Sequence, residues 1–273
     1  MSKKKVLLIT QEMDPYTALS EISDIAAKLP QYLHQNGCEL RVLMPRFGTI
    51  NERRHRLHEV VRLSGMNIIV NDDDFPLIIK VASMPNSRLQ VYFLDNDEFF
   101  KRKSVFEDAD GYPFKDNVDR AVFFCKGAIE TVKKFGWSPD IVHCHGWMTS
   151  LIPMYIRTAY KTEPIFQQSR VIYSLYESPL ERFIDPEFSD KASINNLKPE
   201  DLHMFEHDGQ ISLHRGGAAF ADGVIYASSE VSDTSREEVA GFDKPTHEAT
   251  PDQDVLTGYI DFYESLHAVE AEV

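Results

Sequence analysis

Cysteine is scarce in this sequence, and the few cysteines follow no pattern. The 273 residues include three, Cys38, Cys125 and Cys144, which is an odd number at wide spacings. A secreted disulfide framework needs an even set, and a structural zinc site needs cysteines or histidines a few residues apart. The sequence therefore predicts a protein of a reducing compartment, without disulfides and without a bound metal.

Positive charge is also in short supply. The sequence has 29 lysines and arginines against 43 aspartates and glutamates, and its formal net charge is -14 at pH 7. Nucleic acids and anionic membranes attract basic surfaces, which this composition does not favour. We therefore expect neither a nucleic-acid partner nor a membrane partner.

Long hydrophobic runs are missing. The start, MSKKKVLLIT, has an apolar run of only five or so residues before Gln11 and Glu12 interrupt it. A secretory signal needs about 7 to 15 consecutive apolar residues and a membrane span about 20. We expect no targeting or spanning segment, and therefore a cytoplasmic protein.

Several motifs of catalysis and cofactor binding are absent. The sequence contains no GxxxxGK[ST] phosphate loop, no GxGxxG and no GxSxG nucleophile elbow. His203 and His207 are four residues apart, but HMFEH places the glutamate wrongly for the HExxH zinc motif. We expect no cofactor, no metal and no serine-hydrolase triad.

The first turn after the apolar run 6–10 contains no glycine. It carries Glu12 and Asp14, and the helix expected after it begins with Glu21 and Asp24. A strand-turn-helix that holds phosphates favours glycines, free backbone N–H groups and no negative charge. This turn therefore has the position of a nucleotide loop without its residues.

The sequence does contain a regular alternation of short apolar strands and amphipathic helices, in a chain that is 42% hydrophobic. Strands are expected at 6–10, 40–44, 76–82, 89–94, 140–144, 171–176 and 223–227, and helices at 20–36, 115–134, 147–160, 199–221 and 253–267. This order predicts an α/β fold, a doubly wound and mostly parallel sheet with helices on both faces. Residues 64–94 predict an antiparallel hairpin insertion at the sheet edge.

Two histidines stand at the end of the strand expected at 140–144, in the stretch HCHGW. Side chains alternate along a strand, so His143 and His145 share one face, at the end where α/β sheets place ligands. No aspartate, glutamate or cysteine with ligand spacing lies nearby. Packed or hydrogen-bonded histidines are therefore favoured over a metal pair.

Four stretches in chain order carry a family resemblance. They are VLLITQEMDPY (6–16), GYPFKDNVDRAVFF (111–124), GWSPDIVHCHGWMTSLIPMYI (136–156) and DGQISLHRGGAAFADGVIYAS (208–228). They are similar, respectively, to an S-E-x-x-P turn, a DN-x-x-R-F-x-FF helix, a P-D-[IV]-[IV]-H-x-H-D-W-H segment and a K-x-G-G-x-x-x-A-D-x-[IV]-x-x-[VA]-S segment. Together they resemble the N-terminal half of bacterial glycogen and starch synthases, which are ADP-glucose-using retaining glucosyltransferases.

The resemblance covers about 230 residues and implies a fold and a domain division. It implies that residues 1–230 form one Rossmann-like half of a GT-B glycosyltransferase. Residues 231–273 are then expected to form a C-terminal helical tail that packs back on this domain. The second Rossmann domain of the family has no counterpart in the sequence, so we expect a single-domain relative.

The positions that match functional residues of the family carry other side chains. K-T-G-G-L, which holds the sugar nucleotide, is rewritten as A-L-S-E-I, starting at Ala18. Gly146 and Met148 replace the aspartate and the last histidine of H-x-H-D-W-H, and Leu175 and Tyr176 replace the histidine and asparagine of T-V-H-N. The resemblance therefore implies no catalytic residue at Ala18, Gly146, Met148 or Leu175.

Ligand contacts are expected near the carboxyl ends of the strands. The candidate side chains are Tyr16, Glu21, Asn117, Arg120, His145, Trp147 and Tyr176. Asn117 and Arg120 match the family's helix, although a capping asparagine and a structural arginine explain them equally well. Trp147 matches the family's tryptophan, and burial in the core is its alternative.

Three functions fit these observations. The leading one is a catalytically degenerate synthase-like protein with an accessory, regulatory or glucan-binding role in glycogen metabolism, which contacts a second copy or a synthase through the exposed interdomain face. The second is an active hexosyltransferase that uses ADP-glucose or another sugar nucleotide together with a separate C-terminal half. The third is an α/β domain that binds an unrelated small molecule.

Overall fold

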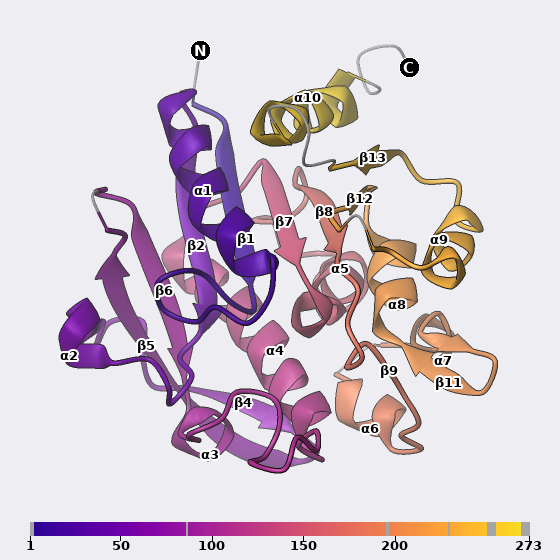
Figure 1. Ribbon diagram of the computed structural model, residues 1–273, viewed down its shortest axis with the longest axis horizontal. Coiled ribbons are helices and arrows are strands. Elements are labelled where there is room, and N and C mark those ends of the chain that lie inside the picture. Colours follow the sequence, from indigo (N-terminus) through magenta and orange to yellow (C-terminus); the bar gives the residue numbers. More distant parts are fainter. Residues whose placement is uncertain (1–2, 86, 195–196, 229, 250–254, 269–273) are drawn as a thin grey trace.

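The computed structural model describes residues 3–85, 87–194, 197–228, 230–249 and 255–268. The strands of its main sheet are β1 (Lys5–Thr10), β2 (Glu39–Pro45), β3 (His58–Glu59), β4 (Met66–Val70), β5 (Asp73–Ser83), β6 (Gln90–Asp95), β7 (Ile141–His145), β8 (Arg170–Leu175), β12 (Gly223–Tyr226) and β13 (Thr246–Glu248). Their order is β13-β12-β8-β7-β1-β2-β6-β5-β3, and β4 pairs with β5 (Figure 1). A small second sheet contains β9 (Arg182–Phe183), β10 (Glu206–His207) and β11 (Gln210–Ser212).

The main sheet is parallel from β13 to β6, and β5 is antiparallel to β3, β4 and β6. The central strand β1 is buried from Val6 to Ile9, because helices cover both of its faces. Both the mostly parallel α/β fold and the antiparallel hairpin within 64–94 are therefore confirmed.

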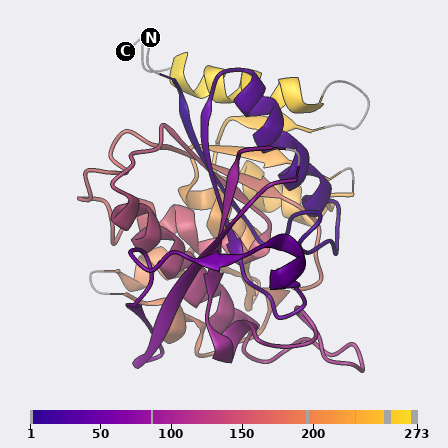
Figure 2. The ribbon, with the colours of Figure 1, turned by 90° about the vertical axis from the view of Figure 1, so that its left-hand side faces the viewer.

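Helices cover both faces of the sheet. They are α1 (Ile22–Gln35), α2 (Glu52–His55), α3 (Asp97–Phe100), α4 (Asn117–Phe135), α5 (Leu151–Arg157), α6 (Phe188–Ala192), α7 (Pro199–His203), α8 (Leu213–Phe220), α9 (Asp233–Ala240) and α10 (Val255–Ala268), with a short 3₁₀ turn η1 (Trp147–Thr149). Helix α5 contacts both α4 and α8, and this group lies on the opposite side of the sheet from α1 (Figures 1 and 2). Among the described residues, we find no helix with the length and apolar character to cross a membrane.

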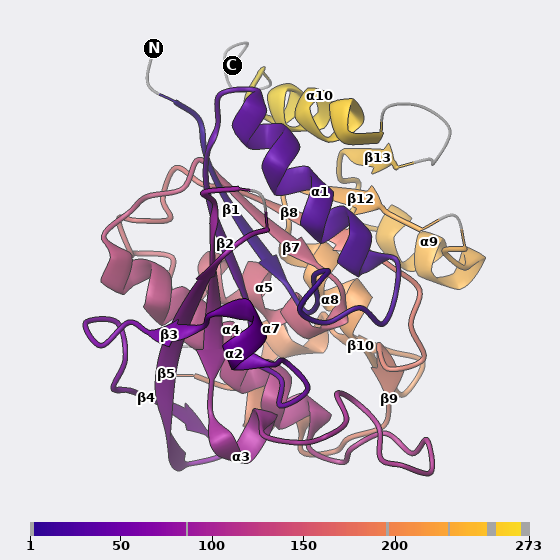
Figure 3. The same ribbon diagram turned by 60° about the vertical axis from the view of Figure 1, so that its left-hand side comes forward.

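The last helix, α10, lies beside α1 on the same face (Figure 3). The hydroxyl oxygens of Tyr32 in α1 and Thr257 in α10 are 2.6 Å apart. Tyr263 of α10 reaches the sheet, where its hydroxyl lies 2.6 Å from Nδ1 of His143. The described part of the C-terminal segment therefore completes the α1 side of the sheet.

The single helix expected at 199–221 is wrong. The chain instead forms α7, the hairpin of β10 and β11, and then α8. Asp208 and Gly209 connect the two strands with φ values of +48° and +77°, as a two-residue hairpin turn requires. The helix expected at 147–160 is likewise shorter, because it is divided into η1 and α5.

Candidate functional site

The carboxyl ends of β1 and β7 mark the place where a doubly wound sheet reverses its strand order. β1 lies between β2 and β7, so the connections on its two sides leave in opposite directions. Ligands of open α/β sheets bind in the crevice outside the strands at this point. The chain places Gln11 and Glu12 after β1, and Gly146 and Trp147 after β7.

Two adjoining cavities, together called the groove here, open at this edge. The crevice cavity has a volume of about 590 Å³ and the outer cavity about 400 Å³. Both are lined by Trp147, Pro179 and Leu180, so these residues connect them. Residues 101–116 and residues 177–185 supply most of the other lining side chains, and we call them the 101–116 wall and the 177–185 wall.

Trp147 forms the floor that the two cavities share. Its side chain is only 2% exposed, and its ring lies 5.0 Å from the ring of Phe106 in the 101–116 wall. Gly146 precedes it with a φ of +82°, and a Cβ at this position would lie 2.5 Å from Oε1 of Gln11. Glycine is therefore favoured where β7 turns into the groove, because this positive φ strains other residues and a Cβ would displace the Gln11 side chain.

The 101–116 wall is fastened by hydrogen bonds from α4. Arg120 donates from Nε to the Phe99 carbonyl at 2.8 Å and from Nη1 to Oδ1 of Asn117 at 2.7 Å. Asn117 in turn donates from Nδ2 to the Phe106 carbonyl at 2.9 Å. These two residues therefore join the start of α4 to Phe99, which lies in α3 just before the 101–116 wall, and to Phe106 within the wall.

Aromatic rings surround the fully buried Arg120. Its guanidinium carbon lies 5.6 to 5.9 Å from the ring centroids of Phe47, Phe100, Phe106 and Phe114. Such rings attract a cation through their negative faces. Burial lowers the pKa of Arg120 to about 10, so the side chain keeps its charge at neutral pH.

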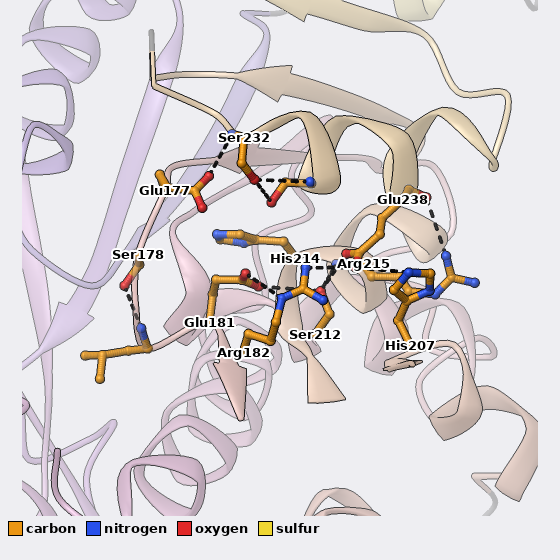
Figure 4. Close-up of polar contacts among 12 residues, drawn as sticks. Glu177, Ser178, Glu181, Arg182, His207, Ser212, His214, Arg215, Ser232 and Glu238 are labelled. Carbon is orange, nitrogen blue, oxygen red and sulfur yellow. Dashed lines mark hydrogen bonds and ion pairs between the residues drawn. The ribbon is translucent and has the colours of Figure 1, made fainter. Parts of the chain in front are cut away.

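The 177–185 wall is fastened by a polar cluster between β9, the start of α8 and α9 (Figure 4). Arg182 lies with Nη2 2.8 Å from Oε1 of Glu238 in α9. Ser212 donates its hydroxyl to Oε2 of the same carboxylate at 2.8 Å. Glu181, next to Arg182, is also buried, and burial raises its pKa to about 7.

The first turn uses its own carboxylate where a phosphate loop would leave N–H groups free. Oε2 of the buried Glu12 accepts the backbone N–H of Leu19 at 2.5 Å and of Ser20 at 2.9 Å. Oε1 accepts the Ser20 hydroxyl at 2.6 Å. Because these three residues line the crevice cavity, an anion there would meet a carboxylate and not free donors.

The lining of the crevice cavity is acidic. Glu12, Glu107, Asp108 and Glu177 line it, and Lys103 is the basic residue among its lining side chains. The outer cavity is lined by three basic residues, Lys115, Arg182 and Lys191, but Arg182 pairs with Glu238 and Lys191 with Asp185 at 2.9 Å. Neutral ligands with many hydroxyl groups suit such a groove better than a diphosphate, which would be repelled by the crevice carboxylates.

The structure brings Asn117 and Trp147 together in the groove, but not the other expected contacts. Tyr16 is packed against Phe93 and donates its hydroxyl to the Ser83 carbonyl at 3.2 Å. Glu21 lies exposed at the start of α1. Arg120 lies beneath the 101–116 wall, and His145 and Tyr176 lie in the core.

The two histidines of β7 are packed side by side in the core. The rings of His143 and His145 lie 3.9 Å apart and are fully buried. Nε2 of His143 lies 2.7 Å from the Ser174 hydroxyl, and Nδ1 of His145 lies 3.0 Å from the Tyr176 hydroxyl. Burial lowers the pKa of His145 to about 3 and holds that of His143 well below its usual value, so both rings are neutral.

The structure also places the four positions that match catalytic residues of the family. Across the described ranges, no three His, Cys, Asp or Glu side chains are placed to share a metal ion. Met148 and Leu175 are fully buried apolar residues, and Ala18 is exposed. The four positions that match catalytic residues therefore offer no titratable side chain near the groove.

Sequence reasoning did not identify Phe106, Leu180, Glu181 or Glu238 as part of the site. Phe106 and Leu180 lie in segments without regular structure, where no periodicity marks a buried side chain. Glu181 and Glu238 are 57 residues apart and belong to no motif. Apart from the aromatic residues near 106–114, the sequence contains no signal that identifies them.

Comparison with known proteins gives a consistent family. The model of the starch synthase catalytic domain family matches residues 5–244. The glycogen synthase of Chlorobium phaeobacteroides is 33% identical over 235 residues, which are 85% of this chain and 47% of that protein. The glycogen synthase of Chlorobium limicola is 38% identical over 173 residues, which are 63% of this chain and 35% of that protein.

A solved structure confirms the fold. The catalytic domain of starch synthase IV from Arabidopsis thaliana, bound to ADP and acarbose, superposes with a TM-score of 0.76 at 17% identity, over 90% of this chain and 51% of that one. This chain thus spans about half the length, or less, of the relatives it matches. The chain belongs to the starch synthase catalytic domain family, and its fold is that of a glycogen synthase-like GT-B protein.

Proposed function

We propose that the groove binds a glucan and transfers no sugar, so that the protein has an accessory or regulatory role in glycogen metabolism. The observation that carries this proposal is the internal carboxylate of Glu12, which occupies the N–H groups of Leu19 and Ser20 inside an acid-lined cavity. A neutral polymer of hydroxyl groups tolerates such a lining. Beside it, the apolar floor and rim at Trp147 and Leu180 suit the apolar faces of sugar rings.

Glycosyl transfer from a sugar nucleotide would need cations or free N–H groups that the crevice cavity does not supply. The leaving diphosphate must be neutralised by cations or aligned N–H groups, and this electrostatic stabilisation is usually the largest catalytic contribution. Lys103 is the single basic residue among the lining side chains of the crevice cavity, against four acidic ones. The positions of Ala18, Met148 and Leu175 add no charge. These features support a catalytically degenerate protein.

The relatives' names support the ligand class without deciding the activity. They are called glycogen synthases, and the solved structure is a starch synthase domain. From these names we propose a glucan as the ligand of this chain, and we do not propose a sugar nucleotide. This chain corresponds to only part of each relative, so the whole enzyme's activity does not transfer with the similarity.

Titration with maltoheptaose, followed by calorimetry, tests the proposal. The Trp147→Phe variant removes part of the shared floor and should raise the Kd about fivefold to tenfold, equivalent to about 1 kcal/mol. The matched control is Trp137→Phe, because Trp137 donates its indole N–H to Glu39 at 2.6 Å and lines neither cavity. Absence of binding by the wild type, or equal weakening in both variants, would contradict the proposal.

An active glucosyltransferase that uses a separate C-terminal half remains the second candidate, because the family and the fold are those of synthases. A thermal-shift measurement with ADP-glucose separates the two. A ligand at 100 times its Kd stabilises a protein by about 2.7 kcal/mol. We expect no shift at millimolar ADP-glucose; a clear shift, together with chain extension of glycogen, would establish the enzyme instead.

A protein partner across the carboxyl edge of the sheet stays a prediction. The edge carries the groove, and a second copy of this chain or a synthase would cover it. Light scattering on the purified protein, with and without a synthase, measures the mass of any complex. If the protein is strictly monomeric and also forms no complex with the synthase, this part of the proposal is contradicted.

A further inference from the structure

Two buried carboxylates from distant segments meet behind the 177–185 wall. Glu181, which follows Leu180 in the groove lining, is 3% exposed, and Glu238 of α9 is 4% exposed. Figure 4 shows both beside the Ser212 side chain at the start of α8. Carboxylates are rarely buried unless charge partners and hydrogen bonds compensate for the lost water.

The hydroxyl between them has too few protons for both. Oγ of Ser212 lies 2.8 Å from Oε2 of Glu238 and 3.5 Å from Oε2 of Glu181. A hydroxyl donates one proton, so it can serve only one carboxylate as a donor. The other contact is satisfied only when Glu181 itself carries a proton and Ser212 accepts it.

The charges around the pair also leave one negative charge uncompensated. Arg182 contacts both carboxylates, with Nη2 2.8 Å from Oε1 of Glu238 and Nε 3.6 Å from Oε1 of Glu181. One guanidinium cannot neutralise two carboxylates, and Glu177 adds a further negative charge nearby. Two buried like charges in this arrangement favour binding of one proton.

Other side chains around the pair do not remove the imbalance. Nε2 of His207 in β10 lies 3.7 Å from Oε1 of Glu238 but also 3.6 Å from the carboxylate of Asp208. Arg215 of α8 points its guanidinium over the Phe242 ring and approaches only the backbone carbonyl of Glu238, at 3.5 Å.

His214, the remaining titratable group of α8, contributes no charge. Its ring lies between the Tyr173 hydroxyl and the Tyr176 carbonyl, each at 2.7 Å. Burial lowers the pKa of His214 to about 4, so the ring is neutral at physiological pH. Burial raises the pKa of Glu181 to about 7, and the charges of Glu238 and Glu177 act in the same direction, while Arg182 and the backbone N–H of His214 offset part of this shift.

We propose that Glu181 and Glu238 share one proton through Ser212, and that this proton holds the 177–185 wall in position, so that the groove loses its ligand as the proton is released. Glu181 and Glu238 are positioning residues, since they act through Pro179, Leu180 and Arg182, which line the groove. Loss of the proton leaves two buried carboxylates facing each other, and separation of the wall from α9 relieves their repulsion. The predicted loss of ligand rests on the proposed function. The predicted protonation and movement of the wall do not, and they can be measured without a ligand.

The first experiment measures the Kd for maltoheptaose at pH 6 and pH 8. If only the protonated form binds, release of one proton near pH 7 raises the apparent Kd about tenfold over this interval. Glu181→Gln replaces the carboxyl group with a neutral amide of the same shape that can donate to Ser212. This variant should bind with the same Kd at both pH values.

Two control variants separate the pair from its neighbours. Glu237→Gln makes the same substitution one residue away, at an exposed position of α9, and should keep the tenfold change. His207→Gln removes the nearby imidazole and should also keep it. A flat profile in His207→Gln would assign the proton to the histidine and overturn the proposal.

The second experiment needs no ligand. In the wild type, the infrared band of a protonated carboxyl group should be present at pH 6 and lost at pH 8. Hydrogen exchange of residues 177–185, measured relative to α4 in the same sample, should accelerate over the same interval. Glu181→Gln should remove both changes.

The two experiments fail in distinguishable ways. If maltoheptaose does not bind at any pH while the band and the exchange change as expected, the proposed function fails and the shared proton stands. If the wild type shows no protonated-carboxyl band at pH 6, or no change in exchange, the shared proton is overturned. This result is obtained on the wild type, so it holds even where Glu181→Gln does not fold.

Discussion

The two walls of the groove face each other across Trp147 but are fastened by different chemistry. Arg120 supports the 101–116 wall from beneath, inside a group of aromatic rings: it binds the Phe99 carbonyl just before the wall and orients Asn117, which donates to the Phe106 carbonyl within it. The 177–185 wall depends on Glu181 and Glu238, two carboxylates that share one arginine. The 101–116 wall is supported by an arginine that stays charged near neutral pH, and the 177–185 wall by a carboxyl group that titrates there.

This difference predicts which wall responds to conditions. Burial lowers the pKa of Arg120 only to about 10, so the 101–116 wall is the same at pH 6 and pH 8. Burial raises the pKa of Glu181 to about 7, so the 177–185 wall changes within that interval. A ligand between them would meet one constant surface and one that depends on pH.

The largest effect on stability is expected from removal of Arg120, which supports the 101–116 wall. Arg120→Met leaves the Phe99 carbonyl and Oδ1 of Asn117 without their buried donor, and each lost bond to a charged group costs about 1.5 to 3 kcal/mol. We expect the free energy of unfolding to fall by about 3 kcal/mol or more, measured by urea denaturation. The loss should be equal at pH 6 and pH 8. A loss that changes with pH would mean that the two walls are not independent.

The next largest effect is the pH dependence that Glu181, in the 177–185 wall, gives to the free energy of unfolding. The pKa of Glu181 is about 7 in the folded chain against an ordinary value of 4.5, so between these values the folded chain holds a proton that the unfolded chain has released. The free energy of unfolding therefore falls as pH rises through this window, by up to about 3 kcal/mol, and is constant above it.

Urea denaturation of the wild type and Glu181→Gln at pH 5, 6, 7 and 8 measures this effect. The variant lacks the group that titrates, so its advantage over the wild type should grow with pH up to about 7 and then stay level. Subtraction of the two curves removes the contribution of the buried histidines, which both proteins share. A difference that shrinks as pH rises would reverse the sign and contradict the assignment.

The sequence was sufficient for the sheet but not for the walls. Strands such as 6–10 and 140–144 were predictable because continuous apolar runs must be covered on both faces. The hairpin of β10 and β11 was not, since HMFEHDGQ also fits a helical pattern, and the positive φ values of Asp208 and Gly209 decide the turn.

For the site, position along a strand identified Trp147 but not the direction of each side chain. His145 and Tyr176 follow the correct strands, yet they pair with each other in the core. Glu181 and Glu238 could not be predicted from the sequence, for another reason. In the sequence SREEVA, nothing distinguishes Glu238, which is buried, from Glu237, which is exposed; only the packing of α9 against α8 does so.

The smallest effect is expected at the exposed side of the constant wall, where Arg102 pairs with Asp116. The pair is bidentate, at 2.7 and 2.5 Å, and the guanidinium lies 4.6 Å from the Phe114 ring, but the two side chains are 31% and 33% exposed. Water and salt screen such pairs, so Arg102→Met should lower the free energy of unfolding by less than about 1 kcal/mol, and by still less in 1 M salt. Urea denaturation at low and high salt measures both values. Arg102→Met makes the same substitution as Arg120→Met, at an arginine that also supports the 101–116 wall. A loss as large as that of Arg120→Met would show that the hydrogen bonds, and not burial of the charge, determine how much each arginine contributes to the free energy of unfolding.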